Sequence, residues 1–230
     1  MILLNGNDWN STFTNIKNKS NEIINTVYQL KIILLGNSGV GKTSVLQRYM
    51  NKDFDETVKC TINSECHNKT IIIDSSNTAK INIWDTCGLE KYKSLTKQYF
   101  INTHGVILMY DVCNEESFKD LNKWLDEFKK NTDKEVSVVL VGNKIDSKDR
   151  IISFERASIF ANNNDLIYIE TSAKEGLNVE TPFESVTKEI IQIIKRNAKF
   201  EKDINEKKSI STIDAIRGKN YRVDKKTKCC

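Results

Sequence analysis

The residues with the clearest chemical potential form the nonapeptide GNSGVGKTS, which runs from Gly36 to Ser44. It fits the pattern G-x-x-x-x-G-K-[ST], in which a glycine-rich turn lets main-chain N–H groups surround an anion. In that pattern Lys42 reaches the outer phosphates of a nucleotide, and the Thr43 hydroxyl is placed for a magnesium ion. The N-terminus of the following helix adds the partial positive charge of the helix dipole, which favours an anion. The loop predicts a bound nucleotide, but it does not separate ATP from GTP, or an enzyme from a switch.

Two further motifs could select the base. NKID, Asn143 to Asp146, follows the apolar run VSVVLVG. The Asp146 carboxylate can accept two hydrogen bonds from the N1–H and 2-amino groups of guanine, which adenine lacks, so adenine would leave it unpaired. A solvated turn of this composition is common after a strand, and NKID gains weight only beside a phosphate loop. In ETSAK, residues 170–174, the Ala173 N–H could meet the guanine carbonyl and the Lys174 stem could pack on the base.

Residues that could sense the third phosphate lie between these motifs. WDTCGLE, residues 84–90, supplies Asp85 near the magnesium ion and Gly88, whose N–H can bond a γ-phosphate because only glycine permits so close an approach. Thr61 lies in a polar loop, where its hydroxyl could complete the magnesium coordination only while the third phosphate is present. Without the other motifs Thr61 would be an ordinary loop threonine. Together they predict a switch.

The composition of the chain indicates the kind of domain that positions these residues. With 230 residues and 39% hydrophobic content, we expect one α/β domain with polar extensions. No run approaches the ~18 apolar residues of a membrane span, and residues 1–26 do not read as a signal peptide. Six cysteines without C-x-x-C spacing predict reduced thiols in cytosol. The chain has a net charge of +4, and its positive excess lies in the last fourteen residues, which could contact nucleic acid or, as we prefer, anionic lipid.

Apolar runs alternate with helical patterns along the chain. We expect strands at 28–35, 70–74, 80–84, 105–112, 136–141 and 166–170, and helices at 43–51, 91–102, 116–131, 153–163 and 183–200. Residues 75–79 are too few for a crossover, so the strands around them should form an antiparallel hairpin at a sheet edge. The rest predicts a doubly wound parallel sheet, whose ligands sit over the carboxyl ends of the strands.

In order and spacing, GNSGVGKTS, Thr61, WDTCGLE, NKID and ETSAK resemble the five guanine-nucleotide motifs of the Ras-like small GTPases, over about residues 28–196. The chain looks most like a Rab, on KINIW at 80–84, KYKSLT at 91–96, YFINT at 99–103, LMYDVC at 108–113 and the terminal cysteine pair. The resemblance implies an α/β phosphate-loop domain over 27–200. Its sheet would have six strands, mostly parallel with one antiparallel edge strand, and helices on both faces. A polar extension, 1–26, would precede this domain, and a basic hypervariable tail, 201–230, would follow it.

The resemblance also implies roles for individual residues. Lys42, Thr61, Gly88 and the position of Leu89 would be catalytic, and Thr43, Thr61 and Asp85 would hold Mg²⁺. The effector face would include Ile62, Cys66, Trp84 and Tyr99. GTP or GDP would be bound by Ser38, Gly39, Val40, Gly41, Lys42, Thr43, Ser44, Phe54, Thr61, Gly88, Asn143, Lys144, Asp146, Ser172, Ala173 and Lys174.

Three positions depart from the Rab pattern. Leu89 stands where the family has the glutamine that orients the attacking water, and leucine can neither donate nor accept a hydrogen bond. We therefore expect slow intrinsic hydrolysis, so that the chain stays loaded with GTP unless a partner supplies the missing polar group. If an activating protein inserts its own glutamine, Leu89 changes intrinsic but not stimulated turnover. Cys66 replaces an aromatic residue in INSEC at 62–66, which puts the effector identity in doubt, and Cys87 replaces an alanine without an assigned role.

Cys229 and Cys230 follow a lysine-rich stretch, and in Rab-like proteins such a pair implies two geranylgeranyl groups. One lipid holds a protein at a membrane marginally, whereas a second lipid or a basic patch makes attachment stable. Palmitoylation or a disulfide are the other interpretations. The implied partners are an exchange factor, a GTPase-activating protein, effectors, and prenylation and membrane-extraction machinery, with no nucleic acid. The implied location is cytoplasmic, peripheral on the cytosolic face of an endomembrane.

Two other classes of function compete with a GTP/GDP switch in vesicle trafficking. A phosphate-loop ATPase or metabolic kinase is disfavoured by NKID and by the lack of sequence for a substrate lid or second domain. A binding module that holds GTP nearly permanently is favoured by Leu89, and its nucleotide exchange rate would distinguish it from a switch.

Overall fold

The computed structural model describes residues 13–17, 23–51, 53–54, 61, 64–86, 99–132 and 135–199. The chain divides into two compact units, residues 1–191 and 192–230. The first unit contains the sheet and all of the predicted nucleotide motifs. In the second unit, residues 192–199 are helical.

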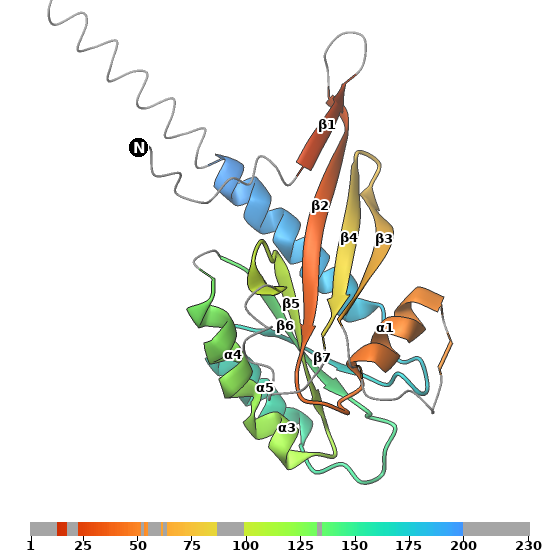
Figure 1. The fold of residues 1–230 in the computed structure, drawn as a ribbon, viewed down its shortest axis with the longest axis vertical. Coiled ribbons are helices and arrows are strands. Elements are labelled where there is room, and N and C mark those ends of the chain that lie inside the picture. The colour runs from red at the N-terminus through yellow and green to blue at the C-terminus, as the bar shows by residue number, and fades with distance from the viewer. Residues whose placement is uncertain are drawn as a thin grey trace, which may run out of the picture. The chain divides into compact units, whose positions relative to one another are not determined.

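The first unit is built on one sheet with the strand order β3-β4-β2-β5-β6-β7 (Figure 1). These strands are β2 (Ile23–Leu35), β3 (Glu65–Asp74), β4 (Asn77–Asp85), β5 (Gly105–Asp111), β6 (Ser137–Asn143) and β7 (Ile167–Thr171). Neighbouring strands run parallel except β3, which pairs antiparallel with β4 at the edge. The six predicted strands, mostly parallel with one antiparallel edge strand, are confirmed.

The edge hairpin closes more tightly than its sequence suggested. Asp74 pairs with Asn77, so only Ser75 and Ser76 form the turn. The Asp74 carboxylate accepts hydrogen bonds from Ser76 N and Asn77 Nδ2, each at 2.8 Å. An aspartate that bonds the backbone two residues later is a common device for closing a turn. The strands can therefore extend to the turn itself.

A seventh strand lies within the segment that the sequence suggested is only a polar extension. This strand, β1 (Phe13–Lys17), pairs antiparallel with β2, from Phe13 opposite Tyr28 to Lys17 opposite Ile23. Because β4 already pairs with Thr26 to Tyr28 along one edge of β2, β1 occupies the other edge. On that edge β5 reaches only Ile32–Leu35, so β1 satisfies backbone groups that β5 leaves available.

Helices cover both faces of the sheet, as predicted. Alternate residues of the central strands, including Ile33 and Leu108, form one buried cluster with apolar residues of α3 (Glu115–Lys119), α4 (Leu121–Lys130) and α5 (Phe154–Asn163). On the opposite face, a Cβ added to Gly105 would lie 2.6 Å from Val186, so helical residues 181–191 lie directly against β5. There α1 (Lys42–Asn51) also packs, with Tyr49 stacked on Phe183 at 4.0 Å.

The predicted helices are mostly confirmed, with one difference. The expected helix over 116–131 is two helices, α3 and α4, separated at Asp120. The Asp120 carboxylate accepts a hydrogen bond from the Asn37 side chain, so this junction faces the phosphate loop. The helix expected at 91–102 falls largely outside the described residues. Within the described part of the chain, no helix is long and apolar enough to cross a bilayer.

Candidate nucleotide site

The phosphate loop connects the end of β2 to the start of α1 and depends on its glycines. Gly36, Gly39 and Gly41 have φ angles of 138°, 78° and 94°, which residues other than glycine rarely adopt. A Cβ at Gly36 would lie 2.1 Å from the Met109 carbonyl oxygen, and one at Gly41 would lie 2.3 Å from Asn143 Nδ2. The loop is therefore pressed against β5 and β6. Only glycines at positions 36 and 41 permit that approach.

Lys42 is the first residue of α1, and its side chain turns back along the loop. Its Nζ donates hydrogen bonds to the carbonyl oxygens of Gly36 at 2.8 Å and Asn37 at 2.9 Å, although the residue is only 5% exposed. This geometry places a cation at the N-terminus of a helix, where the dipole also favours an anion. Ser38 and Gly39 form the exposed rim of the loop. The arrangement suits the phosphates of a nucleotide.

The three predicted magnesium ligands converge. The Thr43 hydroxyl donates to Asp85 Oδ2 at 2.5 Å, and it lies 2.7 Å from the Thr61 hydroxyl. Asp85 is only 2% exposed, and its Oδ1 has no hydrogen-bond partner. A buried carboxylate oxygen without a partner, beside two hydroxyls, is the oxygen-rich donor set that Mg²⁺ prefers. The residues present fit the ion.

The burial of Asp85 leads to a testable pH dependence. Burial raises the pKa of Asp85, while the Thr43 hydrogen bond and Lys42 oppose this shift. A carboxyl with a raised pKa contributes stability below its unfolded-state pKa, and that stability is lost as the pH rises through its folded-state pKa. At neutral pH the charged Asp85 should therefore destabilise the metal-free chain. Urea denaturation in EDTA should find Asp85→Asn more stable than the parent at pH 7, by a margin that shrinks toward pH 4. A margin independent of pH would contradict this explanation.

Asn143, at the end of β6, joins the phosphate loop to the ETSAK segment. Its Nδ2 donates to the Val40 carbonyl at 2.9 Å, and its Oδ1 accepts from Thr171 Oγ1 at 3.1 Å and Ala173 N at 3.3 Å. The residue is 1% exposed. The sequence indicated Asn143 as a nucleotide contact, and in the structure its amide nitrogen and oxygen also hold two predicted binding segments together.

Ser172, Ala173 and Lys174, which the sequence predicted to meet the base, lie on one loop, residues 172–177, which we call the base loop. Its ends are joined because Ser172 and Leu177 exchange two backbone hydrogen bonds of 3.0 Å. The Ser172 hydroxyl accepts from Glu175 N at 3.0 Å and donates to Asp146 Oδ1 at 2.5 Å. Asp146 is exposed. The carboxylate predicted to read guanine is thus fixed to the loop that carries Ala173 and Lys174.

Other predicted residues have different surroundings. Lys144 has a φ of 70°, and its Nζ pairs with Asp111 Oδ2 at 2.7 Å, so β5 orients this side chain. Phe54 is half-buried.

On the predicted effector face, Cys66 lies opposite Trp84 in the β3–β4 register, and the Trp84 and Tyr99 rings lie 5.9 Å apart. Ser44 is half-buried on α1. Ile62, Cys87, Gly88, Leu89, Cys229 and Cys230 lie outside the described residues.

The structure also reveals residues that the sequence analysis did not identify. Asn37, inside the phosphate loop, donates to Asp120 Oδ2 at 2.8 Å and accepts from Trp124 Nε1 at 2.7 Å. Lys123 pairs with the same aspartate, and this hydrogen bond and that of Asn37 hold the pKa of Asp120 below its usual range. Asn37 occupies a variable position of the loop pattern, so the motif alone carried no signal for it.

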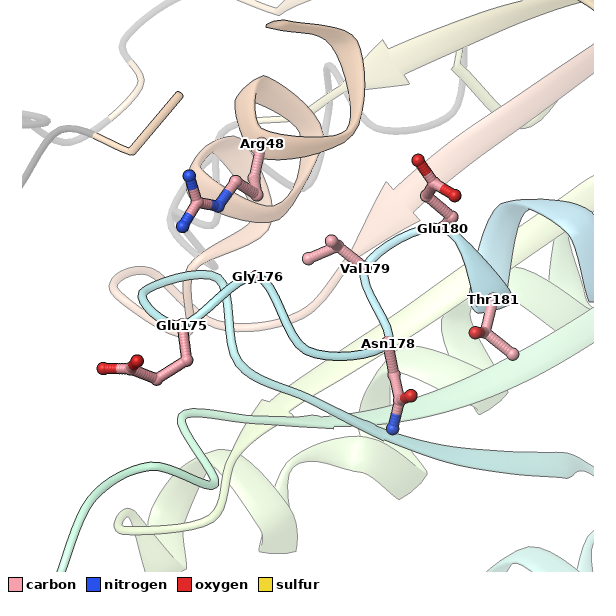
Figure 2. A pocket seen from close by; sticks show the side chains of 7 residues that line it. All are labelled: Arg48, Glu175, Gly176, Asn178, Val179, Glu180 and Thr181. Carbon is pink, nitrogen blue, oxygen red and sulfur yellow. The ribbon is translucent and has the colours of Figure 1, made fainter. Parts of the chain in front are cut away.

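Arg48 is the second such residue. It projects from α1, and its Nη2 donates to the Lys174 carbonyl at 2.8 Å. Beside it lies a cavity of about 430 Å³ lined by Arg48 and residues 175, 176 and 178–181 (Figure 2). In the sequence, Arg48 cannot be told apart from any other charged residue on the exposed face of a helix. Only the fold brings it to the base loop.

Comparison with known proteins agrees with this geometry. The family model described as "Ras family" matches residues 31–192. The chain is 40% identical over 172 residues to Ras-related protein RABA4d of Arabidopsis thaliana, covering 74% of this chain and 77% of that protein. It is 38% identical over 168 residues to GTP-binding protein ypt3 of Schizosaccharomyces pombe, covering 73% and 78%. It is 34% identical over 214 residues to Ras-related protein Rab-25 of Mus musculus, covering 93% and 98%.

The matched region contains the phosphate loop, the cluster of Thr43, Thr61 and Asp85, and the NKID and ETSAK segments. The matches cover 77% of the length of RABA4d and 98% of that of Rab-25. The chain is a member of the Rab family of small GTPases.

Proposed function

We propose that this Rab GTPase is a GTP/GDP switch that regulates vesicle traffic by recruiting effectors, and that its intrinsic GTP hydrolysis is slow. The observation that carries the proposal is the hydrogen bonding of Asn143, which joins the phosphate loop to the base loop in one site. Lys42 and the Thr43, Thr61 and Asp85 cluster supply the phosphate end of that site.

Each end of the site has its own chemistry. Lys42 and the N–H groups of residues 38–43 would neutralise charge on the transferring phosphoryl group. Thr43, Thr61 and Asp85 would hold Mg²⁺, which when bound supplies further positive charge to the phosphates. At the other end, Asp146 would accept from the guanine edge. The Ala173 N–H, which donates to Asn143 Oδ1 at a long 3.3 Å, would share its hydrogen with the guanine carbonyl. Thr61 and Gly88 are the residues proposed to respond to the third phosphate.

Slow hydrolysis follows from Leu89. No side-chain atom at this position can orient the attacking water. The chain would then stay loaded with GTP until a partner supplies the missing polar group. We accordingly propose three classes of regulator: an exchange factor, a GTPase-activating protein, and effectors that bind the face around Ile62, Cys66, Trp84 and Tyr99.

Membrane attachment is proposed from the tail. Cys229 and Cys230 would each carry a prenyl group, and the basic residues before them would add attraction to anionic lipid. The protein would then be peripheral on the cytosolic face of an endomembrane and would be handled by prenylation and membrane-extraction machinery.

The base specificity provides the decisive test. Purified protein should carry GTP or GDP, and isothermal titration should show strong preference for guanine over adenine nucleotides. In Asp146→Asn the side chain loses one acceptor and gains a donor, so it can pair with the 2-keto group of xanthine. Affinity for GDP should fall by about 10²-fold or more, and affinity for xanthosine diphosphate should rise. Equal affinity of the parent for GDP and ADP would end the proposal.

A second function is favoured by Leu89 alone: a scaffold that holds GTP nearly permanently. The two functions differ in the rate at which nucleotide leaves. A switch should release GDP within minutes to hours in EDTA and faster with an exchange factor, whereas a scaffold should retain it under both conditions. Fluorescent nucleotide release separates them.

A further inference from the structure

We propose that Arg48 is a positioning residue that couples the phosphate end of α1 to the base loop and thereby sets the lifetime of bound guanine nucleotide. The inference rests on the proposed function, because it assumes that the base loop reads guanine. It assigns a role to a side chain outside the five nucleotide motifs.

Arg48 lies on the same short helix as the phosphate-binding residues. Lys42 and Thr43 begin α1, and Arg48 follows little more than one turn later. Its guanidinium crosses to a segment 126 residues away in sequence, where Nη2 donates to the Lys174 carbonyl at 2.8 Å. One rigid element therefore contacts both ends of the proposed site.

The contact with the base loop is close as well as polar. Gly176 has a φ of 73°, and a Cβ there would lie 3.2 Å from Arg48 Nε and 3.5 Å from Arg48 Cζ. Figure 2 shows Arg48 extending from α1 toward the turn that carries Glu175 and Gly176. The absence of a side chain at Gly176 thus lets the guanidinium approach the loop backbone while it bonds the carbonyl two residues earlier.

The rest of the base loop is fixed at other points. Ser172 and Leu177 close its ends, and Asn143 holds Ala173 N. The Lys174 carbonyl lies between these anchors, in the peptide that joins Lys174 to Glu175, and the N–H of that peptide donates to the Ser172 hydroxyl at 3.0 Å. Arg48 therefore restrains the part of the loop from which the Ala173 N–H and the Lys174 stem would meet the base.

The planar guanidinium is suited to this role. It presents several N–H donors in a fixed fork, whereas a lysine offers one flexible ammonium. Losing a hydrogen bond from a charged donor to a carbonyl that must stay oriented typically changes a binding equilibrium constant about tenfold. Since the Arg48 contacts described above are with Lys174 and Gly176 of the base loop, its loss should act through the base.

The experiment compares nucleotide release from four full-length proteins: parent, Arg48→Ala, Arg48→Lys and Arg156→Ala. Arg156 is the matched control, because it also makes side-chain hydrogen bonds on the surface, to Glu115 at 2.7 Å, but far from the base loop. Release of GDP should be about tenfold faster from Arg48→Ala, intermediate for Arg48→Lys and unchanged for Arg156→Ala.

A second probe separates positioning from simple destabilisation. In 6-thio-GDP a weak sulfur acceptor replaces the carbonyl that the Ala173 N–H would meet, while the edge read by Asp146 is retained. The parent should prefer GDP to 6-thio-GDP, and that preference should narrow in Arg48→Ala. If Arg48→Ala does not fold, Gly176→Ala disturbs the same contact from the loop side.

The outcomes distinguish a failure of the proposed function from a failure of the proposed role of Arg48. A parent protein that does not prefer GDP to ADP would contradict the proposed function itself. A guanine-selective parent whose Arg48→Ala variant releases GDP at the parent rate would overturn the role of Arg48. So would faster release with an unchanged preference for GDP over 6-thio-GDP, because that result describes a loss of stability alone.

Discussion

Leu89→Gln should accelerate single-turnover GTP hydrolysis by about 10²-fold, which corresponds to about 3 kcal/mol of activation free energy. The parent has leucine at the position where the family's glutamine orients the attacking water, and an amide side chain restores both a donor and an acceptor. Nucleotide affinity should change little, because residue 89 is not among the residues proposed to hold the base or the phosphates. Rapid-quench measurement of phosphate release from preloaded protein gives the rate directly.

Leu89→Met serves as the matched control. Methionine keeps a similar apolar volume and provides no amide group, so its hydrolysis rate should equal that of the parent. Equal rates for the parent and Leu89→Gln would remove the idea that Leu89 limits turnover. A GTPase-activating protein that accelerates the parent and Leu89→Gln to the same rate would instead show that the partner supplies its own glutamine.

Asn143→Ala should weaken guanine nucleotide binding by about 10²-fold or more and also destabilise the fold by several kcal/mol. The substitution removes the group that bonds the Val40 carbonyl, the Thr171 hydroxyl and the Ala173 N–H, and it leaves buried partners unsatisfied. Both ends of the nucleotide site should then lose their relative position. Calorimetric titration with GDP and urea denaturation measure the two effects.

Two further variants make this result interpretable. Asn164→Ala removes an amide that donates to the Phe160 carbonyl at the end of α5, so it should alter stability slightly and GDP affinity not at all. Gly41→Ala forces a Cβ toward Asn143 Nδ2 and should impair binding in the same way as Asn143→Ala. If Asn143→Ala bound GDP as the parent does, Asn143 would not connect the two segments functionally.

Hydrogen bonds between motifs explain why a chain with polar loops can hold a site of this kind. The phosphate loop is tied to β6 by Asn143 and to the α3–α4 junction by Asn37, whereas Arg48 and Asp146 restrain the base loop. Each of these contacts joins segments that are distant in sequence. The nucleotide motifs therefore behave as one connected structure, and changes at one end should be felt at the other.

The sequence by itself determined the motifs, their order and the kind of sheet that displays them. Glycine spacing, the lysine and hydroxyl of the phosphate loop, and the aspartate proposed to read guanine are local chemical requirements, so they can be read from residue types alone. Nearly continuous β-branched runs also predicted buried parallel strands, because a strand covered on both faces needs apolar residues throughout. The short connection at 75–79 similarly identified the antiparallel edge hairpin.

Only the tertiary structure decided which polar side chains hold the motifs together. Asn143 satisfies partners in two other segments, Asp120 and Trp124 reach Asn37, and Arg48 reaches Lys174 across 126 residues of sequence. The strand β1 was equally hidden, because its place depends on backbone groups of β2 that β5 leaves available. Such contacts are set by distances between elements after the chain has packed, and a one-dimensional pattern of residue types does not contain those distances.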